Sequence, residues 1–265
     1  MGIVTLAKEN LIAKRTTRLV KPAPLHPGAR SDAGGKAVSN VILLSLPNKE
    51  YNLLRPHLES TDLPQYEVLE EPGEKIEFAY FLNDGMVSLV ALSRDGRSVE
   101  VGIVGKEGMV GMSLMAGLQR GTFRAIMQMA GCGTRIRSRV FQDLLLSAPT
   151  LRFELNRFNL MHGMQVAQLA ACNRLHEVEQ RLSRWLLMCQ DRMDSQLLPL
   201  THDFLAQMLG TGRPSVSLAA GALESAGLIE NLRGTVKILN RKSLEEAACE
   251  CYGVIQNFNG GMGLK

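Results

Sequence analysis

Three hydrogen-bonding side chains lie close together at residues 213–217 of this 265-residue chain. Arg213 carries a planar fork of N–H donors, and Ser215 and Ser217 each carry a hydroxyl. The guanidinium fork matches the paired acceptors of a guanine base, and a serine hydroxyl can donate to a base or to a phosphate. We therefore take Arg213, Ser215 and Ser217 as candidate residues for reading the bases of DNA.

A second group of polar residues flanks this trio and could contact phosphates. Thr201 and His202 lie where a helix is predicted to begin, with Thr201 as its N-cap, and the free N–H groups of a helix N-terminus suit a phosphate oxygen. Arg233 and Lys237 are basic residues further along the chain, which could contact the DNA backbone. Each of these residues could equally lie on a solvated face, so a role in DNA binding depends on the helices and strands that carry them.

The spacing around these residues predicts two short helices joined by a tight turn. Residues 201–209 are predicted to be a helix that ends at Gly210-Thr211-Gly212. Residues 213–226 restart a helix, with Pro214 in its first turn, where the missing N–H is harmless. Residues 227–239 then predict two strands around a glycine turn. Together these elements predict a winged helix-turn-helix, which presents the start of its second helix to the major groove of DNA.

A long helix is predicted before this segment, over residues 149–174, and an amphipathic helix follows it. Its apolar residues recur at spacings of four and three, as in the heptad seam of a helix dimer. His162 and Gln165 lie within that seam; they could fix the register of a dimer, or be partly exposed residues of a core helix. A second row of apolar residues on the helix indicates that it packs against two surfaces, the chain's own N-terminal part and a partner helix. The predicted dimer seam is Leu151, Leu155, Phe158, His162, Gln165, Leu169 and Cys172, and the second stripe is Leu160, Met164, Ala167 and Ala171.

The first half of the chain has a different sequence pattern, in which short apolar runs are separated by glycine turns. Evenly spaced short strands of this kind are typical of an antiparallel sandwich or small barrel. Asp95-Gly96, between residues 88–93 and 98–103, is the clearest hairpin signal. The predicted strands are Tyr66–Leu69, Phe78–Leu82, Met86–Leu92, Val99–Val104, Met109–Met115, Ala125–Met129 and Thr134–Ile136.

These patterns predict an α+β chain. We expect a disordered basic arm over residues 1–40, a barrel domain over 41–148, a dimerisation helix over 149–174, a winged helix-turn-helix DNA-binding domain over 175–252, and a flexible tail over 253–265.

Charge and composition further limit the class of protein that the chain could be. The net charge is +4, but residues 1–40 alone hold 7 basic and 2 acidic residues, so the charge does not mark a basic DNA-binding domain. No run of about 18 apolar residues exists, which argues against a membrane span. The five cysteines are scattered and odd in number, and the N-terminus does not read as a signal peptide. We expect a cytoplasmic protein with no membrane partner.

The order of barrel, long helix and winged helix-turn-helix resembles the Crp/Fnr transcription regulators. The resemblance is strongest over residues 200–229, and in the barrel at Pro72–Lys75 and Asn83–Gly85. The stretch from His176 to Leu187 and the Cys249–Tyr252 segment resemble an alphaproteobacterial branch of that family.

The resemblance implies a cupin-like barrel of the cyclic-nucleotide-binding-domain type and a homodimer. It also implies double-stranded DNA with a near-palindromic operator, and RNA polymerase, as partners. Arg213 matches a DNA-reading position of the family, whereas Pro214 and Leu218 replace a Glu and a later Arg that members often use. The usual family operator is therefore not expected.

The resemblance also points to an effector pocket in the barrel. Members that bind cyclic AMP hold its ribose with a Gly-Glu pair and its phosphate with an Arg-Ser or Arg-Ala pair. Here Gly111 is followed by Met112 and Ser113, and methionine cannot accept the hydrogen bond of the 2′-hydroxyl. Arg124 and Ala125 could be the phosphate pair, or Arg124 could be a surface residue. We expect an unidentified small effector rather than a cyclic nucleotide, or a barrel kept as a scaffold.

Metal and enzyme chemistry have little support in the sequence. The N-terminal cysteine cluster of the iron–sulfur relatives is absent, and Cys249 and Cys251 alone cannot complete a four-ligand site. A metal role would need recruits such as His176 or a partner chain, so we predict no metal site and no iron–sulfur cluster. No nucleophile elbow, phosphate loop or His-Glu-x-x-His motif is present, so no enzyme is predicted.

The leading hypothesis is thus a homodimeric, sequence-specific DNA-binding transcription regulator, whose barrel senses an effector and repositions the two recognition helices. The alternative is a ligand-binding signalling module whose helix-turn-helix mediates protein contacts.

Overall fold

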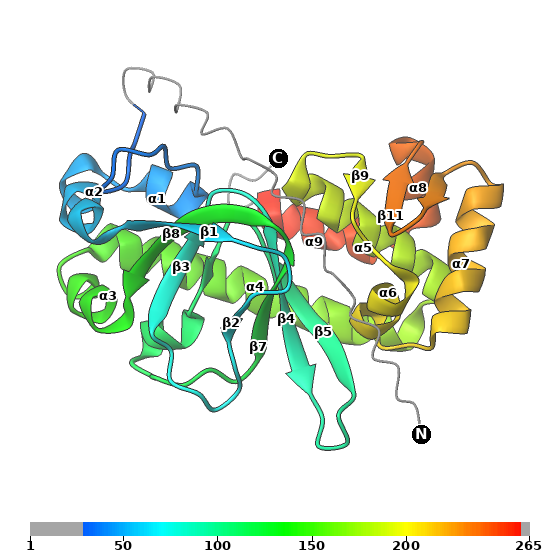
Figure 1. Ribbon diagram of the computed structural model, residues 1–265, viewed down its shortest axis with the longest axis horizontal. Helices are drawn as coiled ribbons and strands as arrows, with labels where there is room; N and C mark the ends of the chain where they lie inside the picture. Colours follow the sequence, from blue (N-terminus) through cyan, green and yellow to red (C-terminus); the bar gives the residue numbers. More distant parts are fainter. Residues whose placement is uncertain (1–28, 261–265) are drawn as a thin grey trace, which may run out of the picture.

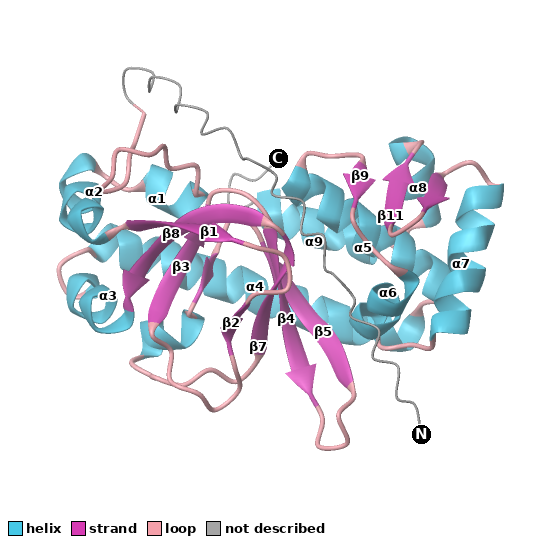
Figure 2. Ribbon diagram, viewed as in Figure 1, coloured by secondary structure: helices cyan, strands magenta, loops and turns pink. Residues whose placement is uncertain are grey.

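The computed structural model describes residues 29–260, which form two parts connected by one long helix (Figure 1). Strands dominate the N-terminal part and helices dominate the C-terminal part (Figure 2). The predicted α+β class is confirmed, as is the order of antiparallel sheets, long helix and winged helix-turn-helix.

The N-terminal part is a barrel made of two four-stranded antiparallel sheets. One sheet has the order β1 (Glu59–Leu63), β8 (Gly131–Arg137), β3 (Phe78–Leu82) and β6 (Met109–Val110). The other has the order β2 (Val68–Glu70), β7 (Arg124–Met129), β4 (Met86–Leu92) and β5 (Ser98–Val104). Alternate side chains from both sheets point inward and fill the barrel core, Phe81 and Met127 among them.

One local prediction in the barrel is confirmed, and another is wrong in part. The hairpin at Asp95-Gly96 is confirmed, because β4 pairs with β5 and Gly96 takes a positive φ of 84° in the turn. The predicted strand Met109–Met115 is wrong beyond Val110. Gly111 turns the chain with a φ of 101°, and a 3-10 helix, Met112–Ala116, follows. The sequence analysis did not predict β1.

The predicted disordered arm is wrong for residues 29–40; residues 1–28 lie outside the described residues. Ser31 bridges to Ala37, and the Arg30 guanidinium donates to the carbonyls of Leu43 and Leu46. Asn40 is buried and caps α1 (Val41–Ser45), which α2 (Asn48–Leu54) follows. This segment is therefore part of the folded barrel domain.

The long helix α4 (Pro149–Leu175) follows α3 (Ser138–Leu145) and lies against both parts of the chain. Its predicted dimer seam needs correction, because the chain itself buries all seven seam residues, from Leu151 to Cys172. The second stripe is the exposed one: Leu160 is 66% exposed and Met164 40% exposed. With 3.6 residues per turn, the stripe lies opposite the seam rather than beside it.

The C-terminal part begins with α5 (Val178–Met193), followed by the two helices of the predicted motif, α6 (His202–Leu209) and α7 (Arg213–Ser225). The two helices pack against each other through buried apolar residues, namely Leu205, Leu209, Val216, Ala219 and Leu223. The wing is a three-stranded antiparallel sheet of β10 (Ile229–Leu232), β11 (Thr235–Ile238) and β9 (Leu197–Leu198). The winged helix-turn-helix is thus as predicted.

The chain ends in two further helices, α8 (Arg241–Ala247) and α9 (Cys251–Gly260). The predicted flexible tail over residues 253–265 is wrong up to residue 260, since α9 packs on α4 and α5 and buries Ile255. Residues 261–265 lie outside the described residues.

Three polar contacts connect the C-terminal part to strand β5 and the loop after it. The indole Nε1 of Trp185 donates to the buried Glu100 Oε1 at 2.8 Å. Arg192 forms a buried ion pair with Glu107 at 2.7 Å, and Gln207 Nε2 donates to Ser98 Oγ at 2.7 Å. The helix-turn-helix is therefore docked against the β4–β5 hairpin (Figure 1).

Candidate nucleic-acid interface

The start of α7 presents its candidate side chains to solvent. Arg213 is the first residue of the helix, its side chain is 65% exposed, and its Nε lies 3.4 Å from Asp203 Oδ1. An exposed ion pair of this length contributes little to stability, so the guanidinium is free to exchange Asp203 for another partner. Ser215 is exposed on the flank of the same turn.

Ser217 and His202 are held together instead of pointing separately into solvent. Nδ1 of His202 lies 3.0 Å from Ser217 Oγ, and its Nε2 lies 3.4 Å from Oδ1 of Asn231 on the wing strand β10. Glu224 in turn accepts a hydrogen bond from the Asn231 backbone N–H at 2.7 Å. This chain of contacts joins α6, α7 and the wing into one surface. The sequence analysis missed Asn231, since nothing local indicates that β10 returns to His202.

The predicted phosphate residues occupy different places. The Thr201 hydroxyl accepts from the backbone N–H of Phe204 at 3.2 Å and so caps α6 as predicted. Lys237 lies 3.6 Å from Glu230 on the neighbouring strand. Arg233 is exposed beside Gly234, whose φ of 72° makes the tight turn of the wing. Within residues 29–260, Arg233 has no side-chain partner, so it is the basic group most available at the wing tip.

A groove of about 340 Å³ gathers part of this set between α6, the start of α7 and the wing. Thr201, His202 and Arg213 line it together with Asn231 and Gly234. Ser215, Ser217, Arg233 and Lys237 do not line it. The groove therefore combines a helix N-terminus with one base-reading candidate.

Leu218, which stands where members of the resembled family often have an arginine, is a further candidate residue for base contact. It lies on the outermost face of α7 and is 78% exposed, unusually high for a leucine. An apolar side chain in the major groove can contact the methyl group of thymine.

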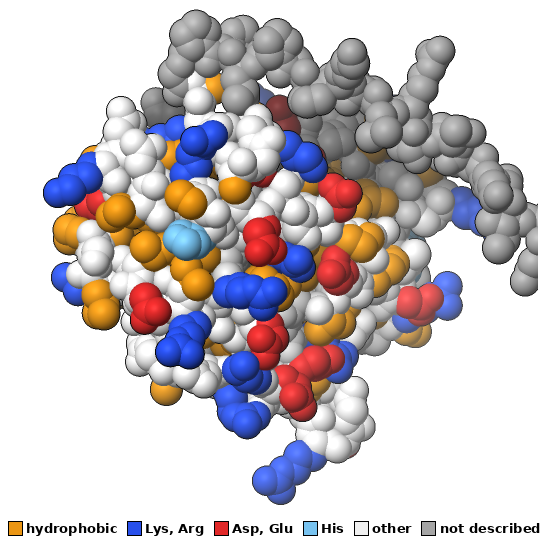
Figure 3. All heavy atoms as spheres, turned by 60° about the vertical axis from the view of Figure 1, so that its left-hand side comes forward, with side chains coloured by type: hydrophobic (Ala, Val, Ile, Leu, Met, Phe, Trp, Pro, Cys, Tyr) orange, Lys and Arg blue, Asp and Glu red, His pale blue; other side chains and the backbone are white. Residues whose placement is uncertain are grey.

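The opposite end of the molecule differs in character. On the face that Figure 3 brings forward, acidic, basic and hydrophobic side chains are interspersed, and no large area is of one kind. This mixed surface offers no basic stripe that would follow a DNA backbone.

The barrel contains a cavity of about 370 Å³ next to α4. Gly111, Met112 and Ser113, three of the expected effector-pocket residues, line it together with Glu70 and His162. The predicted phosphate pair does not: Arg124 forms an ion pair with Glu71 at 2.9 Å, and Ala125 is fully buried. Arg124 and Ala125 therefore do not line this cavity.

Burial shifts the ionisation of two groups that line this cavity. It raises the pKa of Glu70 to about 7 against the opposing hydrogen bond from the Gly111 backbone. Burial also lowers the pKa of His162 to about 4, so the imidazole is neutral at physiological pH. His162 Nε2 has no hydrogen-bond partner among the described residues. The lining therefore favours a ligand that forms hydrogen bonds over an anionic phosphate.

Comparison with known proteins agrees with this architecture. Residues 180–247 match the model of the Crp-like helix-turn-helix domain. No curated protein matches the chain. None of the described helices is long and apolar enough to cross a membrane.

Solved structures share the fold at low sequence identity. A Crp/Fnr-family transcriptional regulator from Eubacterium rectale is 17% identical, with a TM-score of 0.61, over 76% of this chain and 94% of that chain. A CRP-family regulator from Thermus thermophilus is 23% identical, with a TM-score of 0.60, over 71% of this chain and 96% of that chain. FixK2 from Bradyrhizobium japonicum is 14% identical, with a TM-score of 0.62, over 72% of this chain and 98% of that chain.

Fold and site thus define a winged helix-turn-helix protein with an antiparallel barrel of the cyclic-nucleotide-binding type. The chain has the fold of the Crp/Fnr transcription regulators, and its residues 180–247 match the model of the Crp-like helix-turn-helix domain. The alphaproteobacterial branch stays a prediction.

Proposed function

We propose that the protein is a homodimeric, sequence-specific DNA-binding transcription regulator of the cytoplasm, without enzymatic activity. The observation that carries the proposal is the exposed start of α7, where Arg213 and Leu218 face solvent beside the groove and the wing. In this geometry α7 enters the major groove, and Arg213, Ser215 and Leu218 reach base edges. The N-terminus of α6 and Arg233 contact phosphates on either side.

The dimer contact proposed here uses the exposed stripe of α4. Its members are the exposed residues Leu160, Met164, Ala167 and Ala171, at spacings of four, three and four. This spacing suits a helix that packs along a second copy of itself. An apolar stripe of this kind has no role in the isolated chain, so a second copy is the occupant we propose.

The barrel cavity is the proposed effector site. It lies against α4 through His162, and α4 leads directly into the DNA-binding domain. An effector that accepts or donates a hydrogen bond at His162 would bias the position of α4 and, through it, of α7. RNA polymerase as a further partner is proposed on the family resemblance alone.

Selection of bound sequences from a random DNA pool tests the central proposal. A dimer that places two α7 helices in successive major grooves should enrich an inverted repeat with half-site centres about one helical turn apart, roughly 34 Å. Recovery of unrelated sequences without an inverted repeat would contradict it.

A salt titration separates this proposal from the signalling-module alternative. Phosphate contacts release counterions, so the logarithm of the DNA affinity should fall steeply and linearly with the logarithm of the salt concentration. A helix-turn-helix that binds only protein would give no measurable DNA affinity to titrate, while the effector would still raise the stability of the chain.

A further inference from the structure

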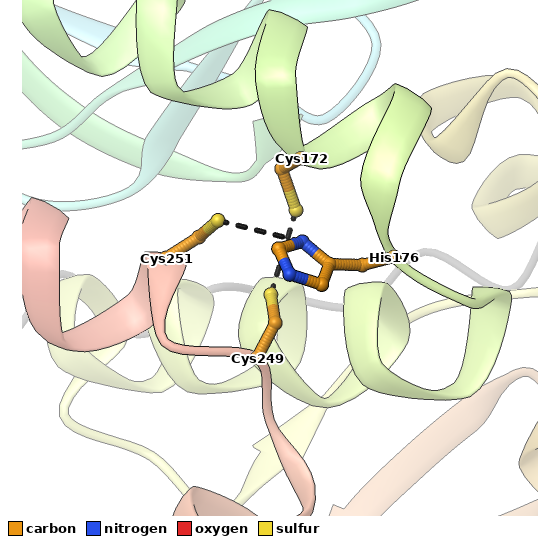
Figure 4. Close-up of side chains that lie close together, drawn as sticks. All are labelled: Cys172, His176, Cys249 and Cys251. Atoms are coloured by element: carbon orange, nitrogen blue, oxygen red, sulfur yellow. Dashed lines mark hydrogen bonds between the residues drawn. The ribbon is translucent and has the colours of Figure 1, made fainter.

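Four metal-ligating side chains meet where the end of α4 lies against the start of α9 (Figure 4). Cys172 belongs to the last turn of α4, and His176 follows as its C-cap. Cys249 lies in the loop after α8, and Cys251 is the first residue of α9. The three cysteines are buried, and all four ligand atoms lie within 4.8 Å of one another. The sequence analysis predicted no metal site because Cys172 is remote in sequence from the Cys249–Cys251 pair.

Two of the six separations between these ligand atoms match those around a single tetrahedral ion, and the other four are no longer than 4.8 Å. Cys172 Sγ lies 3.4 Å from Cys249 Sγ, and Cys251 Sγ lies 3.6 Å from His176 Nδ1. Around one zinc ion, with about 2.3 Å to sulfur and 2.0 Å to nitrogen, neighbouring ligand atoms lie about 3.5–3.8 Å apart. An iron–sulfur cluster would hold the thiolates further apart, since each binds its own iron atom and the iron–iron edge lies between them.

The residues around the four ligands form the outer contacts that metal sites require. His176 directs Nδ1 at the thiols, while its Nε2 lies 3.1 Å from Glu250, the residue between the two cysteines. A carboxylate on the far nitrogen of a ligating histidine fixes its tautomer and orientation. Gln168 Nε2 donates to Cys251 Sγ at 3.0 Å, which stabilises a thiolate there.

The charge of the surrounding residues also favours a metal site with thiolate ligands. Arg181 and Arg184 are buried, at 8% and 3% exposed, and the Nε atom of each has no hydrogen-bond partner among the described residues. Both guanidinium groups are close enough to the cluster to interact electrostatically with Cys172. Three thiolates and one divalent ion carry a net charge of −1, which would partly neutralise these two buried guanidinium groups.

We propose that Cys172, His176, Cys249 and Cys251 form a closed, structural Cys3His zinc site that fastens the C-terminal end of the DNA-binding domain to α4. Thiolate and imidazole ligands in a tetrahedral arrangement select zinc among the common divalent metals. All four positions come from the protein, so no open position remains for a substrate or for water. The ion has a structural role, in which it holds α9 and the loop after α8 on the α4–α5 junction.

Metal analysis of the untagged full-length protein tests the proposal directly. Elemental analysis and native mass spectrometry should find one zinc ion per chain. Replacement by Co²⁺ should give the visible absorption bands of a tetrahedral site, together with thiolate charge-transfer bands in the near ultraviolet. This spectrum reports the ligand set independently of DNA binding, so its failure is separable from failure of the proposed function.

Variants identify the ligands. Cys249→Ser and Cys251→Ser should each weaken zinc affinity at least about 100-fold. The control Cys132→Ser, at an exposed cysteine near the start of β8, should retain one zinc per chain. Glu250→Gln leaves all four ligands in place and should weaken zinc affinity by about 10- to 100-fold. This variant, and the cobalt spectrum of the wild type, keep the test decisive if a cysteine variant does not fold.

Three results would overturn the proposal. The first is a folded wild-type chain whose cysteines react with an alkylating reagent at the same rate with and without zinc. The second is a Cys172–Cys249 disulfide in the protein as isolated under reducing conditions. The third is iron together with acid-labile sulfide, which would replace the single ion with a cluster.

Discussion

Arg213 is the residue at which base recognition can be tested most directly. Arg213→Ala should lower the affinity for the selected operator by about 1–3 kcal/mol and relax the preference at one base pair of each half-site, because the guanidinium fork contacts one base. Binding measured on a panel of single-base operator variants checks both effects. Arg139→Ala, which removes the same charge from α3 at the other end of the molecule, is the matched control. Equal losses in the two variants would remove Arg213 from the proposed interface.

Glu100 gives the interface between barrel and DNA-binding domain a pH dependence. Burial raises the pKa of this carboxyl from 4.5 to about 7, against the opposing hydrogen bonds from Ser88 and Trp185. Arg184 and Arg192 also favour its ionised form. Between these pH values the folded state holds a proton that the unfolded state has lost, so this group lowers stability as the pH rises.

The comparison of wild type with Glu100→Gln measures that effect. From about pH 4.5 to pH 8, the wild type should lose roughly 3 kcal/mol of unfolding free energy relative to the variant. Urea unfolding of both proteins across this pH range gives the difference. A constant difference would mean that Glu100 keeps an ordinary pKa in the folded protein.

Individual residues also show where sequence reasoning reaches its limit. Thr201 and Gly234 could be placed from the sequence, since a cap and a turn depend on neighbouring residues only. Cys172 could not be placed at a metal site, because its distance from Cys249 depends on how α9 packs on α4. The contact of Arg124 could not be placed for the same reason: Glu71, in the loop after β2, holds its guanidinium.

At the scale of elements, α4 is the helix with two apolar faces. Both faces were visible in the sequence, but their periods are equally regular, so spacing could not decide which one the barrel buries. The structure assigns the seam to the chain itself and leaves the opposite stripe exposed.

Placing a charge on the exposed stripe tests the proposed dimer. Met164→Glu should raise the dimer dissociation constant at least about tenfold, because in a symmetric interface the two new carboxylates would face one another across the helix pair. Sedimentation over a range of concentrations measures it. Leu146→Glu places the same charge on an apolar residue that is 80% exposed in the loop after α3, outside the stripe, and should leave the dimer intact. An unchanged dimer in Met164→Glu would mean that the chains associate through another surface.

At the scale of the whole molecule, the proposed zinc ion should stabilise the folded chain by binding the native state alone. Adding a chelator to the zinc-loaded protein should lower the midpoint of thermal unfolding and accelerate hydrogen exchange in α9 and in the last turn of α4. Hydrogen-exchange mass spectrometry locates the change.

The barrel sheets serve as the internal reference in that experiment, since they share no residue with the ligand set. The Cys251→Ser variant should be insensitive to the chelator. If the wild type shows no change in α9, the four residues do not bind a stabilising metal.

The DNA-binding domain is attached to α4 twice, where it begins after His176 and where α9 returns with Cys251. Once the contacts of Trp185, Arg192 and Gln207 with β5 and the loop after it are released, these two neighbouring attachment points define an axis, and the remaining freedom of the domain is mainly a rotation about that axis rather than a displacement away from α4. Helix α7 lies at the edge of the domain that is far from this axis in Figure 1. A small turn at the base of the domain would therefore change the separation between the two α7 helices of a dimer by a much larger amount.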